Sequence, residues 1–296
     1  MKVLNFGSIN IDITYQVKDF VQAGETISSS SVTRHSGGKG FNQSLALARA
    51  GIHVYHAGCI GSDGLFLKEE LEQCGVNTEY LKLVDSATGN AIIQVNSKGN
   101  NCIILYAGAN HCVTEQDIDA VLQNFCPGDV LLIQNEINNL EYLVDKAYAK
   151  GMKIAVNPSP YNESITENIL KKSSWLLINQ VEAQSISGHT KYDQALSYLA
   201  KLCPDSTIIM TLGSEGVMCM DNGRIISHTA YKVNAVDTTG AGDTFTGYYL
   251  AAVLNGGTQE RALELASKAA SLSVQKPGAA ESIPSMEQVE ASFLQN

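Results

Sequence analysis

The sequence has 296 residues, of which 44% are hydrophobic and 17% are charged, with 25 glycines and only 6 prolines. A chain of this length and composition can bury a large core, which excludes an intrinsically disordered protein. Its 30 acidic and 20 basic residues give a formal net charge of −10. This charge argues against nucleic acids and membrane surfaces as partners, because both attract proteins of the opposite sign.

Cysteine usage and the lack of targeting patterns predict a protein of the cytoplasm. The seven cysteines are scattered and contain no Cys-x-x-Cys pair, which is typical of reduced thiols rather than of disulfides or a zinc site. We expect His53 and His56 to lie on one strand as structural residues, since no His-Glu-x-x-His motif is present. No apolar run reaches the roughly 20 residues of a transmembrane helix, and the segment after Met1 lacks a signal-peptide pattern.

Alternating apolar and polar residues in the first third of the chain predict a small, half-exposed sheet. The alternation runs through residues 11–17 and 91–95, and a turn at 98–101 precedes the apolar run 103–106. Such alternation is typical of strands with one packed face and one wet face. We expect a separate sheet that is inserted between elements of a larger core.

From Val130 onward, short apolar runs alternate with helix-like stretches. The apolar runs are 130–133, 154–156, 175–178 and 207–210, and the helix-like stretches lie near 140–150 and 193–201. Buried parallel strands with helical crossovers form a doubly wound sheet. Helices expected over about 243–254 and 260–275, and a short one that opens with a capping pattern at 285–288, close the chain. The predicted fold class is therefore α/β, with a doubly wound, mostly parallel sheet flanked by helices.

The strongest chemical motif is Asp237-Thr238-Thr239-Gly240-Ala241-Gly242-Asp243, directly before a predicted helix. Free N–H groups at a helix start, with glycines that permit close approach, can bind an anion. An acid at position 243 would then lie beside phosphate oxygens, where it can accept a proton from an attacking hydroxyl. On the pattern alone, a plain glycine turn with Asp243 as a favourable helix-start residue explains the motif about equally well.

A second glycine-rich segment, Ser36-Gly37-Gly38-Lys39-Gly40-Phe41-Asn42, leads into a helix predicted over 43–50. One cation and one amide among glycines suit a hydroxylated or anionic small molecule. The spacing fits neither a Walker A loop nor a dinucleotide fingerprint. The alternative is a flexible loop with an exposed lysine.

Weaker polar signals follow the predicted strands, at the ends where open α/β sheets place their sites. They are the pair Asn10 and Asp12, Glu136, the pair Asn179 and Glu182, and the segment Thr211-Leu212-Gly213-Ser214-Glu215-Gly216. Each alone is more typical of turn or cap chemistry, but their shared location favours a common site. A serine hydrolase has little support, because no Gly-x-Ser-x-Gly elbow is present.

Together these segments, in the same order and over nearly the whole chain, resemble the ribokinase-like family of carbohydrate kinases, also called the PfkB family. The most specific are residues 237–243 and Gly38-Lys39-Gly40 with Asn42. The resemblance implies ATP-dependent phosphorylation of a small unphosphorylated sugar at a hydroxymethyl group, and the chain is most similar to the branch that converts D-ribose into D-ribose 5-phosphate. The alternatives are a kinase for another sugar or a nucleoside, and a non-catalytic sugar or nucleotide sensor, although a sensor has no use for Asp243 beside an anion hole.

The resemblance also implies roles for the candidate residues. Asp243 would be the catalytic base, and Gly240, Ala241 and Gly242 would form the anion hole. The sugar would be held by Asn10, Asp12, Gly38, Lys39, Gly40, Asn42 and Glu136. ATP would be bound by Asn179, Glu182, Thr211, Gly213, Ser214 and Gly216, with Asn179 and Glu182 near the phosphates and Mg²⁺. Phe41 stands where the family commonly has a small residue, which suggests a narrower sugar pocket.

The resemblance further implies an activating K⁺ ion and a dimer. The cation would be bound by Asp237, by the carbonyls of Thr239, Ser273, Lys276 and Gly278, and by the hydroxyl of Ser282; alternatively, Asp237 only caps its turn. The small sheet would be a lid over the sugar, formed by about residues 11–17, 25–35 and 88–108 within a single kinase domain, 1–296. We also expect it to form a homodimer interface, because its apolar face needs a cover.

Overall fold

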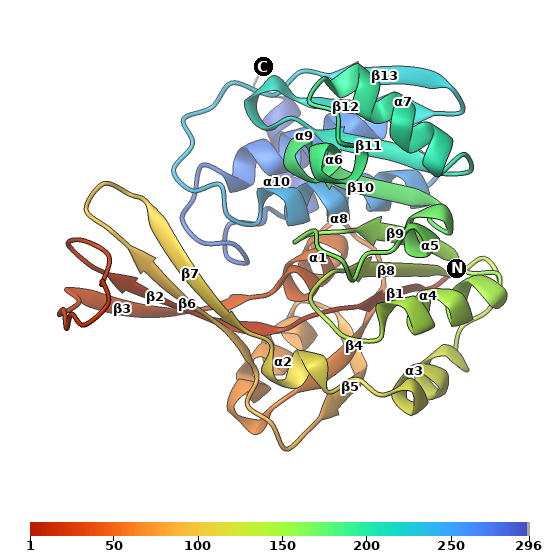
Figure 1. Cartoon of the computed structure of the whole chain (residues 1–296). Helices are drawn as coiled ribbons and strands as arrows, with labels where there is room; N and C mark the ends of the chain where they lie inside the picture. Colours follow the sequence, from red (N-terminus) through yellow and green to blue (C-terminus); the bar gives the residue numbers. More distant parts are fainter. Residues whose placement is uncertain (295–296) are drawn as a thin grey trace.

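The computed structural model describes residues 1–294, in which a large sheet carries helices on both faces and a smaller sheet projects to one side (Figure 1). The large sheet has the strand order β13-β12-β11-β10-β9-β8-β1-β4-β5. All neighbours from β5 to β11 pair in parallel, and β12 and β13 are antiparallel. Its strands are β1 (Val3–Phe6), β4 (Val54–Ile60), β5 (Asn77–Leu83), β8 (Val130–Gln134), β9 (Lys153–Asn157), β10 (Trp175–Asn179), β11 (Thr207–Thr211), β12 (Val217–Asp221) and β13 (Arg224–His228).

The helices form two layers, one on each face of this sheet. They are α1 (Lys39–Arg49), α2 (Leu65–Gln73), α3 (Glu115–Leu122), α4 (Leu140–Ala149), α5 (Glu167–Lys171), α6 (Gln180–Ser187), α7 (Tyr192–Leu202), α8 (Ala241–Leu254), α9 (Gln259–Ser273) and α10 (Met286–Phe293). Val3 in β1 packs in a core cluster with side chains of α1, α2, α8 and α9, whereas its neighbour Leu4 packs in a second cluster with α3, α4 and α7. Because successive side chains of a strand point to opposite faces, the strands are buried on both sides. The doubly wound fold is confirmed.

The four predicted apolar runs are all strands, and each is longer by one polar residue at its carboxyl end. These residues are Gln134, Asn157, Asn179 and Thr211. The apolar pattern ends before the strand does, because at this edge the last side chain faces other polar groups instead of the core. The predicted helices differ from α4, α7, α8 and α9 only at their ends, and the capping box of Ser285 and Gln288 begins α10 as expected.

Two predictions about the region from Ser36 to His56 were wrong. The helix predicted over 43–50 begins at Lys39, because Gly38, at φ 90°, makes the turn from strand to helix. Gly40 then lies so close to the first strand that an added Cβ would be 2.4 Å from the backbone nitrogen of Ser8. The segment is therefore not a flexible loop. His53 precedes β4 instead of lying in it, and His56 is fully buried.

The small sheet has the order β3-β2-β6-β7 and is the projecting part of Figure 1. Its strands are β2 (Asn10–Gln16), β3 (Ser31–Gly37), β6 (Gly89–Val95) and β7 (Asn101–Tyr106). We call it the lid sheet. Of the segment 25–35, only the part from Ser31 onward is a strand. Among the helices within residues 1–294, none combines the length and the apolar character needed to cross a membrane.

Candidate active site

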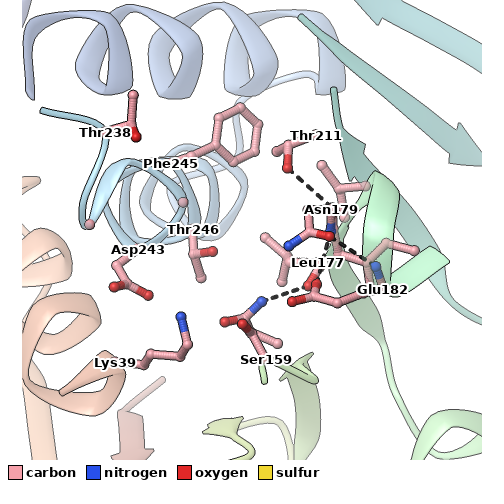
Figure 2. A pocket seen from close by; sticks show the side chains of 15 residues that line it. Lys39, Ser159, Leu177, Asn179, Glu182, Thr211, Thr238, Asp243, Phe245 and Thr246 are labelled. Atoms are coloured by element: carbon pink, nitrogen blue, oxygen red, sulfur yellow. Dashed lines mark hydrogen bonds between the residues drawn. The ribbon is translucent and has the colours of Figure 1, made fainter. Parts of the chain in front are cut away.

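A cavity of about 210 Å³ lies at the carboxyl ends of β9, β10 and β11, between the first turns of α1 and α8 (Figure 2). The predicted residues that line it are Lys39, Asn179, Glu182, Thr211, Gly240, Gly242 and Asp243. They come from segments up to 200 residues apart in sequence, and the fold brings them to the sheet edge where open α/β proteins bind ligands. These residues therefore lie together around one cavity.

The start of α8 is open to the cavity. Gly240 has φ 73°, and an added Cβ there would lie 3.0 Å from the Cβ of Ala279, so this turn requires glycine. A Cβ added at Gly242 would meet nothing within 4 Å, so Gly242 borders free space. The N–H of Ala241 donates to the carbonyl of Thr238 (3.3 Å), but the N–H groups of Gly242 and Asp243 have no hydrogen-bond acceptor among the described residues, which makes this end of α8 suitable for an anion.

Asp243 is buried in the first turn of α8 and is held by two amides from α1. Its Oδ2 accepts a hydrogen bond from Nδ2 of Asn42 (3.1 Å), and its Oδ1 accepts one from Nε2 of Gln43 (2.8 Å). The two helices approach closely because Gly247 of α8 lies against Ala46 of α1, where an added Cβ would be 2.4 Å from the Cβ of Ala46. Gln43 was not among the predicted site residues.

Lys39 supplies a positive charge to the cavity, and Figure 2 shows its side chain reaching toward Asp243. Burial disfavours the charged ammonium, but the carboxylates of Asp243, Glu136 and Glu182 outweigh this effect and raise the pKa of Lys39 above its usual value. The cavity therefore combines a retained cation with a helix N-terminus, which are two features that attract a phosphate group.

Carboxylates and amides gather on the lid side of α1. Oε2 of Glu136, after β8, accepts hydrogen bonds from the backbone N–H of Lys39 (2.9 Å) and from the hydroxyl of Ser8. Asp12 of β2 lies directly over Gly37, where a Cβ would overlap its carboxylate. Burial, followed by the neighbouring Glu136, raises the pKa of Asp12 to about 7. Such a group of acceptors suits the hydroxyls of a neutral ligand and repels one that already carries phosphate.

Asn10, at the start of β2, lies two residues before Asp12. Its Oδ1 accepts a hydrogen bond from Nδ2 of Asn110 (2.7 Å), and both side chains are buried. Gly89 of β6 permits this contact, since a Cβ there would lie 2.4 Å from Oδ1 of Asn10. Phe41, in contrast, is fully buried in the core. Of the residues predicted to hold the sugar, only Lys39 lines the cavity; the others lie around the start of α1, beside it.

Asn179 and Glu182 cap a helix, as a turn-and-cap role predicts, and they also face the cavity. Oδ1 of Asn179 accepts hydrogen bonds from the N–H groups of Val181 and Glu182, and Oε2 of Glu182 accepts one from the N–H of Asn179. They form a capping box at the start of α6 and also line the cavity. Thr211 is the register partner of Asn179 on the neighbouring strand and lies beside it in Figure 2. Gly213, Ser214 and Gly216 lie in the turn after β11 and do not line the cavity.

The segment predicted to bind K⁺ is brought together in part. Oδ1 of Asp237 accepts hydrogen bonds from Thr239, and Oδ2 accepts one from the N–H of Gly278 (3.0 Å). Although burial opposes ionisation, these hydrogen bonds lower the pKa of Asp237. The hydroxyl of Ser282 donates to the carbonyl of Ala279, and the carbonyl of Ser273 accepts from the N–H of Lys276. Within the described part of the chain, no group of three or more His, Cys, Asp or Glu side chains is arranged to hold a metal.

Sequence reasoning missed Gln43, Asn157 and Ser159. Asn157 ends β9 and lines the cavity with Ser159, so the rule that singled out Asn179 after β10 applied equally to it. Gln43 gave a weaker signal, since a glutamine in the first turns of a helix has no motif of its own.

Comparisons with known proteins agree with this geometry. A model of the pfkB family of carbohydrate kinases matches residues 1–286. The chain is similar to a ribokinase of Haemophilus influenzae, with 33% identity over 98% of this chain and 97% of the relative. Among solved structures it is similar to a ribokinase of Thermotoga maritima, with TM-score 0.89, 31% identity and full coverage of both chains. It is also similar to a ribokinase of Arabidopsis thaliana complexed with ribose and ATP, with TM-score 0.88, 28% identity, and 98% and 97% of the two chains covered.

The fold, the phosphate-suited helix start and these similarities define an ATP-dependent kinase that phosphorylates a sugar. The chain belongs to the pfkB family of carbohydrate kinases. The resemblance stated from the motifs is confirmed, and so is the ribokinase fold with its smaller sheet.

Proposed function

We propose that this kinase transfers the γ-phosphoryl group of ATP to the hydroxymethyl group of D-ribose, giving D-ribose 5-phosphate and ADP. The observation that carries the proposal is the pair of carboxylates, Asp12 and Glu136, beside the start of α1. Carboxylates accept hydrogen bonds from sugar hydroxyls and repel a sugar phosphate. The similarity to ribokinases along nearly the whole chain supports ribose as the acceptor.

In this proposal, the sugar is held by Asn10, Asp12, Gly38, Lys39, Gly40, Asn42 and Glu136. Asp243 takes the proton of the attacking hydroxyl while the new O–P bond forms and the bond from phosphorus to ADP breaks. Backbone N–H groups of Gly240, Ala241 and Gly242, at the start of α8, stabilise the transferred phosphoryl group. Rate enhancement comes mainly from positioning and charge stabilisation, since phosphoryl transfer requires little covalent chemistry from the protein.

ATP is assigned to the side of the cavity formed by Asn179, Glu182 and Thr211, with Gly213, Ser214 and Gly216 in the turn behind it. Mg²⁺ commonly binds one or two protein carboxylates together with waters and phosphates. Glu182 fits this use: the capping hydrogen bond occupies Oε2, and Oε1 accepts none from the described residues. Glu182, with Asn179 beside it, would hold Mg²⁺, which neutralises phosphate charge when bound.

A K⁺ ion beside the anion hole is part of the same proposal. Asp237, the carbonyls of Thr239, Ser273, Lys276 and Gly278, and the hydroxyl of Ser282 would hold it. The fit rests on Asp237, whose lowered pKa keeps it ionised and which already joins the turn before α8 to the loop after α9. The ion would supply the charge that fixes the backbone of residues 239–242.

The remaining parts of the proposal concern assembly. The chain acts as one domain, 1–296, in the cytoplasm, and it dimerises through the lid sheet. Ile92 and Ile104 are cross-strand partners on the face of the lid sheet opposite to Asp12, and both side chains are exposed. Val32 and Tyr106 lie exposed on the same face, so an apolar surface there is available for a second copy.

The test is ADP release from ATP and Mg²⁺ with ribose, deoxyribose, fructose, fructose 6-phosphate, common hexoses and nucleosides. We expect the highest kcat/KM with ribose. A higher kcat/KM with deoxyribose, a hexose or a nucleoside would change the assigned acceptor. A preference for fructose 6-phosphate would contradict the role given to the carboxylate pair.

A further inference from the structure

A chain of buried amide side chains runs from Asp243 into the interior of the sheet. The Nε2 group of Gln43 donates both of its hydrogens, one to Oδ1 of Asp243 (2.8 Å) and one to Oδ1 of Asn157 (2.9 Å). The carbonyl oxygen of Gln43 accepts a hydrogen bond from Nε2 of Gln134 (2.7 Å), and Gln134 also donates to Oδ1 of Asn5 (2.9 Å). Gln43 is fully buried, and both N–H hydrogens and the carbonyl oxygen of its side chain have hydrogen-bond partners.

Both ends of this chain are fixed by backbone carbonyls. Nδ2 of Asn157 donates to the carbonyl of Leu177 (2.9 Å), so the Oδ1 of Asn157 must face Gln43. Nδ2 of Asn5 donates to the carbonyl of Gly40 (2.7 Å), so the Oδ1 of Asn5 must face Gln134. A carbonyl can only accept a hydrogen bond, and therefore neither terminal amide can turn over without losing its partner.

The orientation of the Gln43 amide follows from these two ends. If it turned over, its oxygen would face the carboxylate of Asp243 and the oxygen of Asn157, and its NH₂ group would face the NH₂ group of Gln134. Such buried contacts between like groups are costly. The end of the chain away from Asp243 carries no charge. Nδ2 of Asn5 donates to the hydroxyl of Ser44, which is hydrogen-bonded to Nδ1 of His56, and burial lowers the pKa of His56 to about 4.

We propose that Gln43 is a positioning residue for phosphoryl transfer, which fixes Oδ1 of Asp243 so that Oδ2 is the oxygen that takes the proton. The inference rests on the proposed role of Asp243 as the base. Among the described residues Oδ2 accepts a hydrogen bond only from Asn42, which is one of the residues proposed to hold the sugar. The proton of the sugar hydroxyl passes to Oδ2 as that hydroxyl oxygen bonds to phosphorus and the bond to ADP breaks. Oδ1 keeps its hydrogen bond to Gln43 throughout.

The test compares two variants of Gln43 with the wild type. Gln43→Met keeps the length of the side chain but removes its N–H donor. Gln43→Glu keeps an acceptor for Gln134 and places a second carboxylate against Asp243. We measure kcat, the KM for sugar and for ATP, the pH dependence of kcat, and the melting temperature, all on the intact chain. The acceptor is the one that the wild type phosphorylates fastest, so that a wrong assignment of ribose leaves the test of Gln43 intact.

We expect Gln43→Met to lower kcat about ten- to hundredfold, with both KM values changed less than about threefold, since misplacing a reacting group affects the chemical step. The acidic limb of the pH profile should move to higher pH, because an N–H donor favours the ionised carboxylate over the protonated form. Gln43→Glu should move this limb further in the same direction. The charged groups that influence Asp243 are Lys39 of α1, Asp12 of β2 and Glu136 after β8, and both variants retain them.

Ser173→Ala is the matched control. Ser173 is buried and bonded to the carbonyl of Leu170 and to Ser206, away from the cavity residues, so its loss should lower the melting temperature without changing kcat or the pH profile. A second control combines Gln43→Met with Asp243→Asn. If Gln43 acts through Asp243, the double variant should lose no more activity than Asp243→Asn alone.

Wild-type kcat and pH profile in Gln43→Met would overturn the proposal, as would a loss confined to the KM for sugar. Full additivity in the double variant would also contradict it. If Gln43→Met does not fold, Gln43→Glu decides on the same criteria. Nearly normal turnover of Asp243→Asn would instead reject the underlying role of Asp243, and the two failures are thereby distinguished.

Discussion

The carboxylate of Asp237 accepts a hydrogen bond from the backbone N–H of Gly278 over 3.0 Å, although 41 residues separate them in the sequence. This contact joins the turn that opens α8 to the loop that follows α9. Both segments contain residues proposed to hold K⁺. A substitution in either segment should therefore alter the position of the backbone N–H groups of residues 240–242.

Activation by K⁺ is the first prediction. At constant ionic strength and without Na⁺, added K⁺ should raise the turnover of the wild type, because in the proposed site the cation would fix the N–H groups of residues 239–242 toward the phosphate. Asp237→Ala should be insensitive to K⁺. A flat response in the wild type, or full activation that survives in Asp237→Ala, would show that no such site operates.

Asp243→Asn should lower kcat on the order of 10²–10⁴-fold, because the amide keeps the shape of the carboxylate but cannot take the proton. The affinity for ATP, measured by calorimetry, should change much less. The variant must be shown to fold by its melting curve. Turnover close to that of the wild type would remove Asp243 from the role of base.

Glu136→Gln should weaken sugar binding and leave the nucleotide side unchanged. Oε2 of Glu136 accepts from the N–H of Lys39, and loss of one charged acceptor in a buried polar site costs about 1–3 kcal/mol. The KM for sugar should therefore rise roughly 5- to 150-fold while the KM for ATP stays constant. If the KM for ATP rises instead, Glu136 belongs to the nucleotide side.

Asp12 should make sugar binding depend on pH near neutrality. Its pKa is raised to about 7, so the carboxyl group is protonated below this pH and ionised above it. The ionised form is the stronger acceptor for a hydroxyl, and the KM for sugar should fall as the pH rises through about 7. In Asp12→Asn this fall should disappear.

The raised pKa of Asp12 should also make the stability of the fold depend on pH: a higher pH should favour sugar binding but destabilise the folded chain. Between the unfolded value of 3.8 and the folded value of about 7, the folded chain binds more protons than the unfolded chain at Asp12. The free energy of unfolding should therefore decrease as the pH rises through this window. Asp12→Asn should raise the melting temperature relative to the wild type more at pH 8 than at pH 5. An equal difference at both pH values would contradict the raised pKa.

The interior of the sheet was predictable from the sequence, but the edge that forms the site was predictable only in part. Apolar runs such as 175–178 identified the strands, whereas the polar residue that ends each strand lies outside the pattern. The position of Asn179 could be inferred from the rule for parallel sheets. The contact of Gln43 with Asp243 could not, because it joins residues 200 apart through the packing of two helices, and a single sequence contains no record of that pairing.

The positions of Gly213, Ser214 and Gly216 also could be predicted only in part from the sequence. Their glycines indicated a turn after β11, which is correct, but the turn lies outside the lining of the cavity. Gly216, at φ 111°, is required where a Cβ would be 2.1 Å from the carbonyl of His228. Glycine patterns identify turns, and the space around a turn depends on its distant neighbours.

The contact of Gly247 with Ala46 restricts how the enzyme can move. The helix that bears Gln43 and the helix that bears Asp243 meet there without room for a methyl group, so they cannot slide or roll past each other. The first turns of α1 and α8 are thus held in one fixed arrangement. We therefore expect the opening that admits a sugar to come from the sheet of β2, β3, β6 and β7, which contacts the loop after α9 through His35 and Glu281. Mutations on that sheet away from Asn10 and Asp12 should therefore change the rates of sugar entry and product release while leaving the bond-breaking step intact.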